Sequence, residues 1–229
     1  MLEYRSEEIE IMDDLTISGA VVDQTLRELN TINKRLGGNQ ISVSSYKKIA
    51  SKANGNIMLA DLGCGGGDIM MEMANWSRKN DVKASFLGID ANENIVEYAL
   101  RNTKRYSEIT YQSINIFSDD FRKQTFDVIH CCLFVHHFTS DQLVSLFRQF
   151  SDQARIGVII NDLHRHPLAY WSIKLLTSLF SKSEMVKNDA SVSVSRGFKK
   201  KELVSILKSA GIEEFQLKWK WAFRWELIF

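Results

Sequence analysis

The chain has 229 residues, a length that suits one α/β domain with an appendage, or at most two small domains. Hydrophobic residues make up 45% of it, which is typical of a globular protein with a sizeable core. The net charge of +1 gives no overall attraction to nucleic acid, so we expect no nucleic-acid partner.

Cysteine usage and the N-terminus are typical of a cytoplasmic protein. Cys64, Cys131 and Cys132 form neither a disulfide framework nor a zinc-binding pattern, so we expect reduced thiols. The stretch 1–11 is acidic and polar, which disfavours a signal peptide. No run of about 18 uncharged apolar residues occurs, so we expect no stable insertion into a membrane.

Residues 1–54 are predicted to form a helical cap ahead of the main domain. Leucine and isoleucine recur three or four residues apart within 6–36, which predicts a helix. A Gly-Gly pair is expected to end this helix, and a shorter helix is expected at 45–52.

In the main domain, predicted at 55–229, strands and helices alternate. Short apolar runs predict five buried strands, at 57–61, 84–90, 109–113, 126–133 and 156–162. Helices with one apolar face are expected between them, at 68–79, 92–105 and 139–152. This order predicts a doubly wound α/β fold with a mostly parallel sheet and helices on both faces. Ligands of such sheets bind beyond the carboxyl ends of the strands.

A helical insertion is expected at about 167–195, after the fifth strand. It begins with a helix over 167–180 that has Pro167 in its first turn and apolar side chains along one side. Its place over the predicted mouth of the site suggests a lid for an apolar substrate. A homodimer face, ordinary core packing or a weak contact with a membrane surface would explain the same pattern.

The C-terminal segment is predicted to complete the sheet. A helix is expected at 199–210. Over 215–229 every odd position is apolar, and this period of two predicts β structure. Because a typical strand is shorter than this stretch, two strands are expected. An antiparallel hairpin here would bring the sheet to seven strands.

The stretch 61–67, DLGCGGG, directly follows the first predicted strand and precedes a helix. Gly63 and Gly65 let the backbone turn sharply and approach a ligand closely. Asp61 can accept hydrogen bonds from a cationic amine. Asp90, which ends the second strand, is placed to accept both hydroxyls of an adenosine ribose.

A nucleotide-dependent oxidoreductase is the competing interpretation of this loop. A dinucleotide fingerprint needs glycine at the sixth position counted from Gly63, but Asp68 stands there. An anionic side chain at that helix start would repel a pyrophosphate. The loop therefore favours a cofactor with an ammonium group and no phosphate.

These motifs resemble those of class I S-adenosylmethionine-dependent methyltransferases. The loop resembles the family's glycine-rich motif, Asp90 in LGID its ribose-binding acid, and Asn115-Ile116 its adenine-binding pair, where most members have Asp at 115. The resemblance covers residues 55–165 and implies a Rossmann-like methyltransferase fold that uses S-adenosylmethionine and releases S-adenosylhomocysteine. It implies these cofactor-binding residues: Asp61, Gly63, Cys64, Gly65, Asp90, Ala91, Asn115, Ile116, Cys132, Leu133 and His137. It also suggests that Arg5 and the turn at 33–38 close over the methionine end.

Two further resemblances concern the acceptor. Residues 126–138 resemble the FDxI…LHHF stretch of many small-molecule methyltransferases. The leader and residues 159–167 resemble bacterial methyltransferases encoded beside type III polyketide synthases, which implies O-methylation of an alkyl-phenol or alkyl-pyrone. Carbon methylation of the quinone-biosynthesis type and a non-catalytic module that binds S-adenosylmethionine stay open.

Histidines gather at the predicted carboxyl edge of the sheet. His136 and His137 follow the fourth strand and His164 follows the fifth, so these three are the candidate catalytic residues. A phenol must lose its proton, and a histidine with a pKa near neutrality suits that task. Alternatively, His137 packs beside the cofactor and His136 caps a turn. His130, inside the fourth strand, is expected to be a hydrogen-bonded core residue.

We expect no metal ion in this site. Asn161 and Asp162, after the fifth strand, could supply two oxygen ligands for magnesium. The fourth strand, however, ends in Cys131, Cys132 and Leu133, with no carboxylate. The histidine spacing is not characteristic of zinc either.

Overall fold

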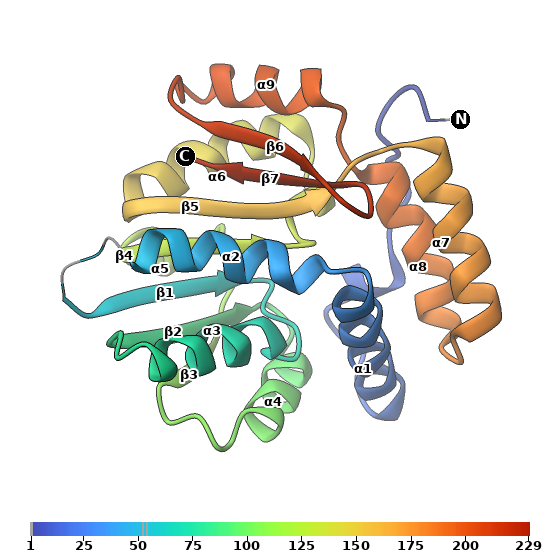
Figure 1. Cartoon of the computed structure of the whole chain (residues 1–229). Helices are drawn as coiled ribbons and strands as arrows, with labels where there is room; N and C mark the ends of the chain where they lie inside the picture. The colour runs from blue at the N-terminus through green and yellow to red at the C-terminus, as the bar shows by residue number, and fades with distance from the viewer. Residues whose placement is uncertain (1, 52, 54) are drawn as a thin grey trace.

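A seven-stranded sheet forms the centre of the computed structural model, which describes residues 2–51, 53 and 55–229 (Figure 1). The strand order is β3-β2-β1-β4-β5-β7-β6. The strands are β1 (Ile57–Leu62), β2 (Ala84–Asp90), β3 (Ile109–Ser113), β4 (Phe126–Cys132), β5 (Ala154–Leu163), β6 (Gln216–Lys220) and β7 (Arg224–Ile228). The first five are parallel, and β7 pairs antiparallel with β5 and β6. The predicted fold class is confirmed.

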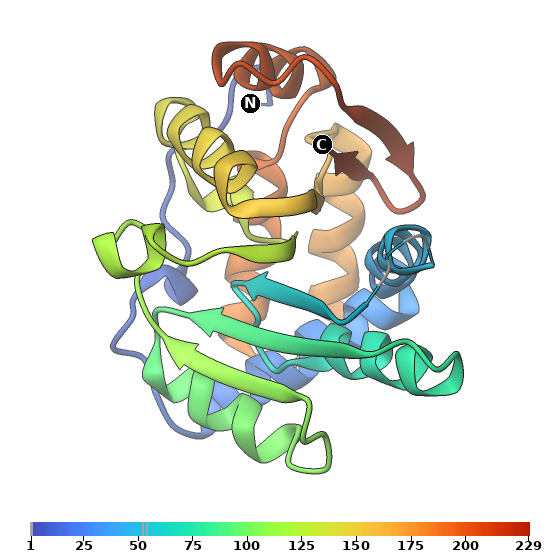
Figure 2. The same cartoon turned by 90° about the vertical axis from the view of Figure 1, so that its left-hand side faces the viewer.

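Helices cover both faces of this sheet (Figure 2). They are α1 (Ala20–Arg35), α2 (Gly38–Ala50), α3 (Asp68–Lys79), α4 (Glu93–Asn102), α5 (Asp119–Arg122), α6 (Ser140–Gln153), α7 (Pro167–Phe180), α8 (Glu184–Arg196) and α9 (Lys200–Ser209). There are also two short 3-10 helices, η1 (Ile11–Asp13) and η2 (Val135–His137). Buried side chains of α2 and α3 pack on one face and those of α6 and α9 on the other. The central strands are buried on both faces, which explains their continuous apolar sequences.

The prediction of one helix over 6–36 is wrong for its first part. Only α1, from Ala20 to Arg35, is a regular helix, and the backbone before it is irregular apart from η1. Gly19 precedes α1 with a φ of +79°. The carboxylate of Asp189 in α8 accepts the N–H groups of Ile11 and Met12 at 2.9 and 3.0 Å, so this segment is attached to α8 in addition to its own short turns.

The second predicted helix begins earlier than expected. It starts at Gly38, directly after Gly37, which has a φ of +75°, and it ends at Ala50. The predicted helix end at Lys52 and the predicted boundary of the cap at Asn54 lie outside the described residues. The short helix α5 was not predicted.

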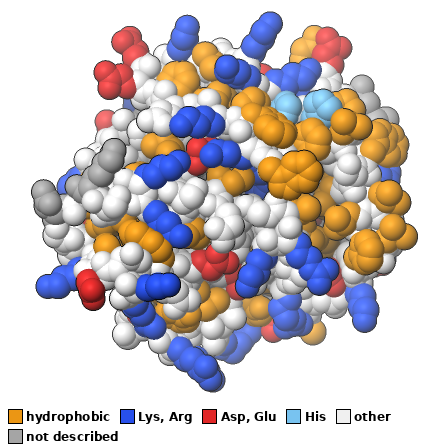
Figure 3. All heavy atoms as spheres, viewed as in Figure 1, with side chains coloured by type: hydrophobic (Ala, Val, Ile, Leu, Met, Phe, Trp, Pro, Cys, Tyr) orange, Lys and Arg blue, Asp and Glu red, His pale blue; other side chains and the backbone are white. Residues whose placement is uncertain are grey.

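The expected insertion consists of α7 and α8. With α1 they stack beyond the tips of β1 and β5 (Figure 1), where the carboxyl ends of the parallel strands lie. Along the outer side of α7, large apolar side chains are exposed: Leu168, Trp171, Leu175 and Leu179. Hydrophobic side chains gather on this part of the surface (Figure 3). No helix among the described residues is long and apolar enough to span a bilayer.

Candidate functional site

A cavity of about 640 Å³ lies at the carboxyl edge of the sheet, beneath α1, α7 and α8. Every residue that the resemblance assigned to the cofactor contributes to its wall: Asp61, Gly63, Cys64, Gly65, Asp90, Ala91, Asn115, Ile116, Cys132, Leu133 and His137. Their roles as cofactor ligands stay predictions. They meet because the carboxyl ends of parallel neighbouring strands lie side by side.

The glycine loop needs its glycines for steric reasons. Gly63 and Gly65 have φ values of +67° and +51°, which side chains disfavour. A Cβ atom on Gly63 would lie 2.3 Å from the ring of Phe134, another residue of the cavity wall. The N–H groups of Gly63 and Cys64 donate to the carbonyl of Ile89 at 2.8 and 3.1 Å, which ties the loop to β2.

A chain of buried hydrogen bonds orients Asp61. The Oδ1 atom of Asp61 lies 2.6 Å from Nδ1 of His130, whose Nε2 lies 2.8 Å from the Ser42 hydroxyl. Asn161 donates its amide N–H to that hydroxyl at 3.0 Å. His130 is therefore bonded through both ring nitrogens, as expected. Since these partners are buried, the carboxylate of Asp61 is held in place at the cavity wall.

Asp90 lies at the end of β2 and is the acid suited to the ribose. Burial raises its pKa to about 6, although backbone N–H donors, including that of Asn92 at 3.0 Å, oppose this effect. Beyond it, the Oδ1 atom of Asn115 accepts the N–H of Phe117 at 2.9 Å, and Ile116 offers an apolar side chain to the cavity.

The residues present fit a nucleoside that carries a cationic amino acid. Gly63 and Gly65 leave the space that side chains would fill, and the carboxylates of Asp61 and Asp90 line the same cavity. Asp68 also lines it, at the first turn of α3. The cavity wall thus offers an acid where a dinucleotide would place its pyrophosphate, which disfavours that ligand.

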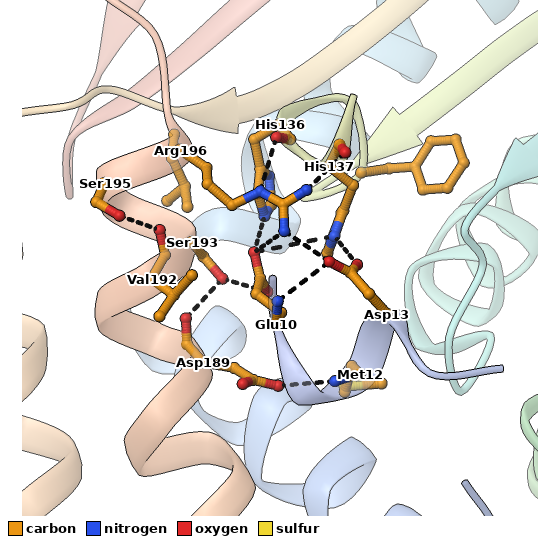
Figure 4. A network of polar contacts seen from close by, with 12 residues as sticks. Glu10, Met12, Asp13, His136, His137, Asp189, Val192, Ser193, Ser195 and Arg196 are labelled. Carbon is orange, nitrogen blue, oxygen red and sulfur yellow. Dashed lines mark hydrogen bonds and ion pairs between the residues drawn. The ribbon is translucent and has the colours of Figure 1, made fainter. Parts of the chain in front are cut away.

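His136 is buried between the carboxylates of Asp162 and Glu10, and Figure 4 shows it beside Glu10. Its Nδ1 lies 2.7 Å from Asp162 and its Nε2 lies 3.4 Å from Glu10. Burial alone would lower the pKa of His136, but these two carboxylates raise it to about 9. Asp162 also accepts the backbone N–H groups of residues 134–136, so it caps η2. A histidine that is protonated at neutral pH and enclosed on both sides is a poor proton acceptor.

His137 is the better placed of the two neighbouring histidines. Its side chain is 22% exposed and lines the cavity. Its Nδ1 lies 2.6 Å from Asp13, and Nη1 of Arg196 donates to the other oxygen of Asp13 at 2.6 Å (Figure 4). No described residue bonds to Nε2 of His137, so this nitrogen is free for a ligand.

Two arginines hold the loop after β4, and neither role was foreseen. Arg5 donates to the carbonyls of His136 and Phe138 at 2.9 and 2.8 Å. Arg196 donates to the carbonyl of His137 at 2.6 Å. The suggestion that Arg5 closes over the methionine end is wrong, because it binds this loop and is not part of the cavity wall. Asn33, from the turn suggested with it, does line the cavity.

The cluster around Glu10 offers atoms that could hold a metal ion. Glu10, His136 and His137 place one potential ligand atom each within 4.8 Å of one another. However, Nη1 of Arg196 lies 3.7 Å from the same oxygen of Glu10, so a guanidinium already supplies positive charge there. The absence of a metal ion therefore stays our prediction.

His164 lies apart from the other two candidate histidines. Its Nδ1 accepts the indole N–H of Trp219 at 3.2 Å, and its ring packs against Trp225 at a centroid distance of 5.0 Å. It is not part of the cavity wall. The hairpin of β6 and β7 covers this end of β5, and the sequence gives no register from which that could be foreseen.

Away from the glycine loop the cavity wall is largely apolar, although polar side chains such as Asn33, Ser172 and Arg224 also reach it. The apolar side chains come from the N-terminal segment, α1, α7, α8 and the turn between β6 and β7: Met12, Leu15, Leu29, Ile32, Leu36, Ala169, Ile173, Leu176, Val186, Trp221 and Phe223. One side of α7 thus faces the cavity while the other side is exposed. None of these residues was predicted individually, although a lid over 167–180 was.

Comparisons with known proteins agree with this geometry. A family model described as a methyltransferase domain matches residues 59–157. The chain is similar to human N-acetylserotonin methyltransferase in complex with S-adenosylmethionine, at 17% identity over 90% of this chain and 55% of that chain, with a TM-score of 0.64. It is also similar to the plantazolicin methyltransferase in complex with S-adenosylhomocysteine, at 20% identity over 86% and 77% of the two chains, with a TM-score of 0.59.

A third similar structure is magnesium protoporphyrin IX methyltransferase from Synechocystis, at 16% identity over 85% and 83% of the chains, with a TM-score of 0.57. At such identities, these likenesses establish the shared fold. No curated protein matches the sequence.

Proposed function

We propose that this chain, in which residues 59–157 match a methyltransferase domain model, is an S-adenosylmethionine-dependent methyltransferase that methylates a hydroxyl of a small, hydrophobic phenolic or pyrone acceptor. One observation carries the proposal. A single cavity runs from the glycine loop and Asp90 to an apolar wall built by α1, α7 and the turn between β6 and β7. It therefore offers a polar site for the cofactor beside an apolar site for the acceptor.

The chain's own residues would bind and orient both reactants. When bound, S-adenosylmethionine supplies an electrophilic methyl group on a positively charged sulfur. Asp90 would accept the ribose hydroxyls, Asp61 the ammonium group, and Asn115 with Ile116 would contact the adenine. The apolar wall would align the acceptor and exclude water, and such alignment supplies much of the rate acceleration.

His137 is the residue we propose as proton acceptor. Asp13 holds its Nδ1 at 2.6 Å, which favours the tautomer with the proton on Nδ1 and leaves Nε2 able to accept a proton from a hydroxyl. His136 would instead support the loop as a buried cation.

Methyl transfer to a ring carbon is the alternative reaction and would use the same cofactor residues. The carbon methyltransferase domain of the citrinin polyketide synthase is among the similar structures, at 12% identity and a TM-score of 0.55. Incubation with S-adenosylmethionine labelled with carbon-13 in its methyl group, followed by NMR of the product, separates the two. A methoxy carbon signal supports our proposal, and a methyl signal on ring carbon contradicts it.

Location and assembly are also proposals. All three cysteines are free thiols, which supports a cytoplasmic location.

The exposed side of α7 would serve as a homodimer face, and sedimentation equilibrium on wild type and on a Trp171→Ser variant tests this. A wild type that is monomeric at high concentration contradicts the dimer.

A further inference from the structure

Arg224 is a buried arginine in the cavity wall that forms no direct ion pair with a described residue. The carboxylate of Asp162 acts on it only at longer range and is itself hydrogen-bonded to His136. It begins β7 and is only 3% exposed. Its Nη2 donates to the side-chain oxygen of Asn33 at 2.6 Å. Its Nη1 is buried and has no hydrogen-bond partner. Within the described part of the chain, no Asp or Glu oxygen lies within 4.0 Å of its guanidinium.

The other buried arginines of the described chain are neutralised. Arg165 pairs with both oxygens of Glu202, and Arg196 pairs with Asp13. A guanidinium keeps its charge in a protein, and a buried charge without a partner is strongly unfavourable. The exception at Arg224 therefore indicates that a ligand in the cavity supplies the missing negative charge.

The position of Arg224 is held by the fold. It pairs with Leu163 across β5 and β7, and it follows a turn in which Ala222 and Phe223 have φ values of +59° and +55°. Gly38 leaves room for the guanidinium, because a Cβ atom there would lie 3.2 Å from Nη2.

Strand order places this arginine on the acceptor side of the cavity. Asp90 ends β2, and Arg224 begins β7, four strand positions away in the sheet. At about 4.8 Å between neighbouring strands, the two residues are roughly 19 Å apart across the sheet, with the glycine loop of β1 between them. The cavity residues Trp221 and Phe223, next to Arg224 in the chain, are apolar.

We infer that Arg224 binds an anionic oxygen of the acceptor, so that the acceptor is an amphiphilic acid. Such a molecule has an apolar body and a headgroup that carries a carboxylate, an acidic enol or an acidic phenol. Guanidinium groups bind such oxygens through charge-assisted hydrogen bonds. Naming the ligand as the acceptor rests on the proposed function.

Calorimetry tests whether Arg224 binds an anionic headgroup. The protein is saturated with S-adenosylhomocysteine and titrated with decanoate or with 1-decanol, which share their apolar tail and differ in charge. Wild type should bind decanoate about 10-fold to 100-fold more tightly, as expected for hydrogen bonds to a charged group. Arg224→Gln should lose this preference, and Arg224→Lys should keep part of it. Arg155→Gln is the matched control, because Arg155 is 60% exposed and pairs with Asp127 away from the cavity.

Two results would overturn the inference. The first is equal affinity of wild type for decanoate and 1-decanol, which needs no variant to fold. The second is an Arg224→Gln variant that loses affinity for S-adenosylhomocysteine but keeps it for 5′-methylthioadenosine, because Arg224 would then bind the cofactor's carboxylate. If wild type does not bind S-adenosylhomocysteine at all, the proposed function itself is contradicted. Failure of the inference about Arg224 and failure of the proposed function are therefore distinguishable.

Discussion

Cofactor affinity should depend on pH through Asp90. Its carboxylate is buried at the end of β2 and accepts the backbone N–H of Asn92 at 3.0 Å. Burial raises its pKa to about 6. In the proposed function the ribose hydroxyls would donate hydrogen bonds to the ionised carboxylate, so a proton on Asp90 would compete with the cofactor.

The size of this effect follows from the pKa. Above pH 6 the carboxylate is ionised and binding costs no deprotonation. Below pH 6 each further unit costs about 1.4 kcal/mol, so affinity should fall about tenfold between pH 7 and pH 5. The same raised pKa means that ionisation of Asp90 disfavours folding. The stability of the cofactor-free protein should therefore fall as pH rises from about 4 to about 6, whereas cofactor affinity rises with pH.

Calorimetric titration with S-adenosylhomocysteine at several pH values measures the effect. Asp90→Asn is the matched variant, since it keeps the shape and cannot titrate. It should bind weakly at neutral pH and show a much flatter profile. A wild-type affinity that stays constant down to pH 5 would refute the reasoning about Asp90.

Four further predictions concern the loop, the two neighbouring histidines and the lid. Gly63→Ala should abolish binding of S-adenosylhomocysteine in calorimetry, since its Cβ would lie 2.3 Å from a ring in the wall; retained affinity would contradict the close approach. His137→Asn should lower kcat about 10²-fold to 10⁴-fold, and an unchanged kcat would exclude it as base. In urea unfolding, the free energy of unfolding of wild type should fall by about 3 kcal/mol as pH rises from about 6.5 to 9, because the raised pKa of His136 stabilises the fold only while that ring is protonated. His136→Asn should lack this dependence on pH, and the same dependence in both proteins would contradict the explanation. Leu176→Ala, in the cavity wall, should raise the acceptor KM, whereas Leu175→Ala, 62% exposed on the outer side of α7, should not; equal effects would argue against the lid.

The cofactor side of the site could be predicted because it is local in sequence. The glycine loop directly follows β1, and Asp90 ends β2, so strand prediction alone places both at the carboxyl edge. Asn115 and Ile116 follow β3 in the same way. The alternation of strands and helices then determines the fold class.

His137 was a candidate from the sequence, but its surroundings could not be predicted, because they depend on contacts between distant segments. His137 and Asp13 are 124 residues apart, and Asp13 lies in a segment that was predicted to be helical. That segment bonds to α8, where the sequence 191–195, SVSVS, alternates like a strand although it is helical. Tertiary contacts thus override local preference there. Arg224 reaches the cavity only through the register of β5 and β7.

Calorimetry of S-adenosylhomocysteine binding to wild type and to Asp90→Ala tests the proposed function most directly. Wild type should bind with micromolar affinity. Asp90→Ala should lose affinity roughly 100-fold or more, because two hydrogen bonds to a charged group, about 1.5 to 3 kcal/mol each, disappear. No binding by folded wild type would contradict the proposed function, and a nucleotide-dependent oxidoreductase or a partner-binding module would then explain the cavity better.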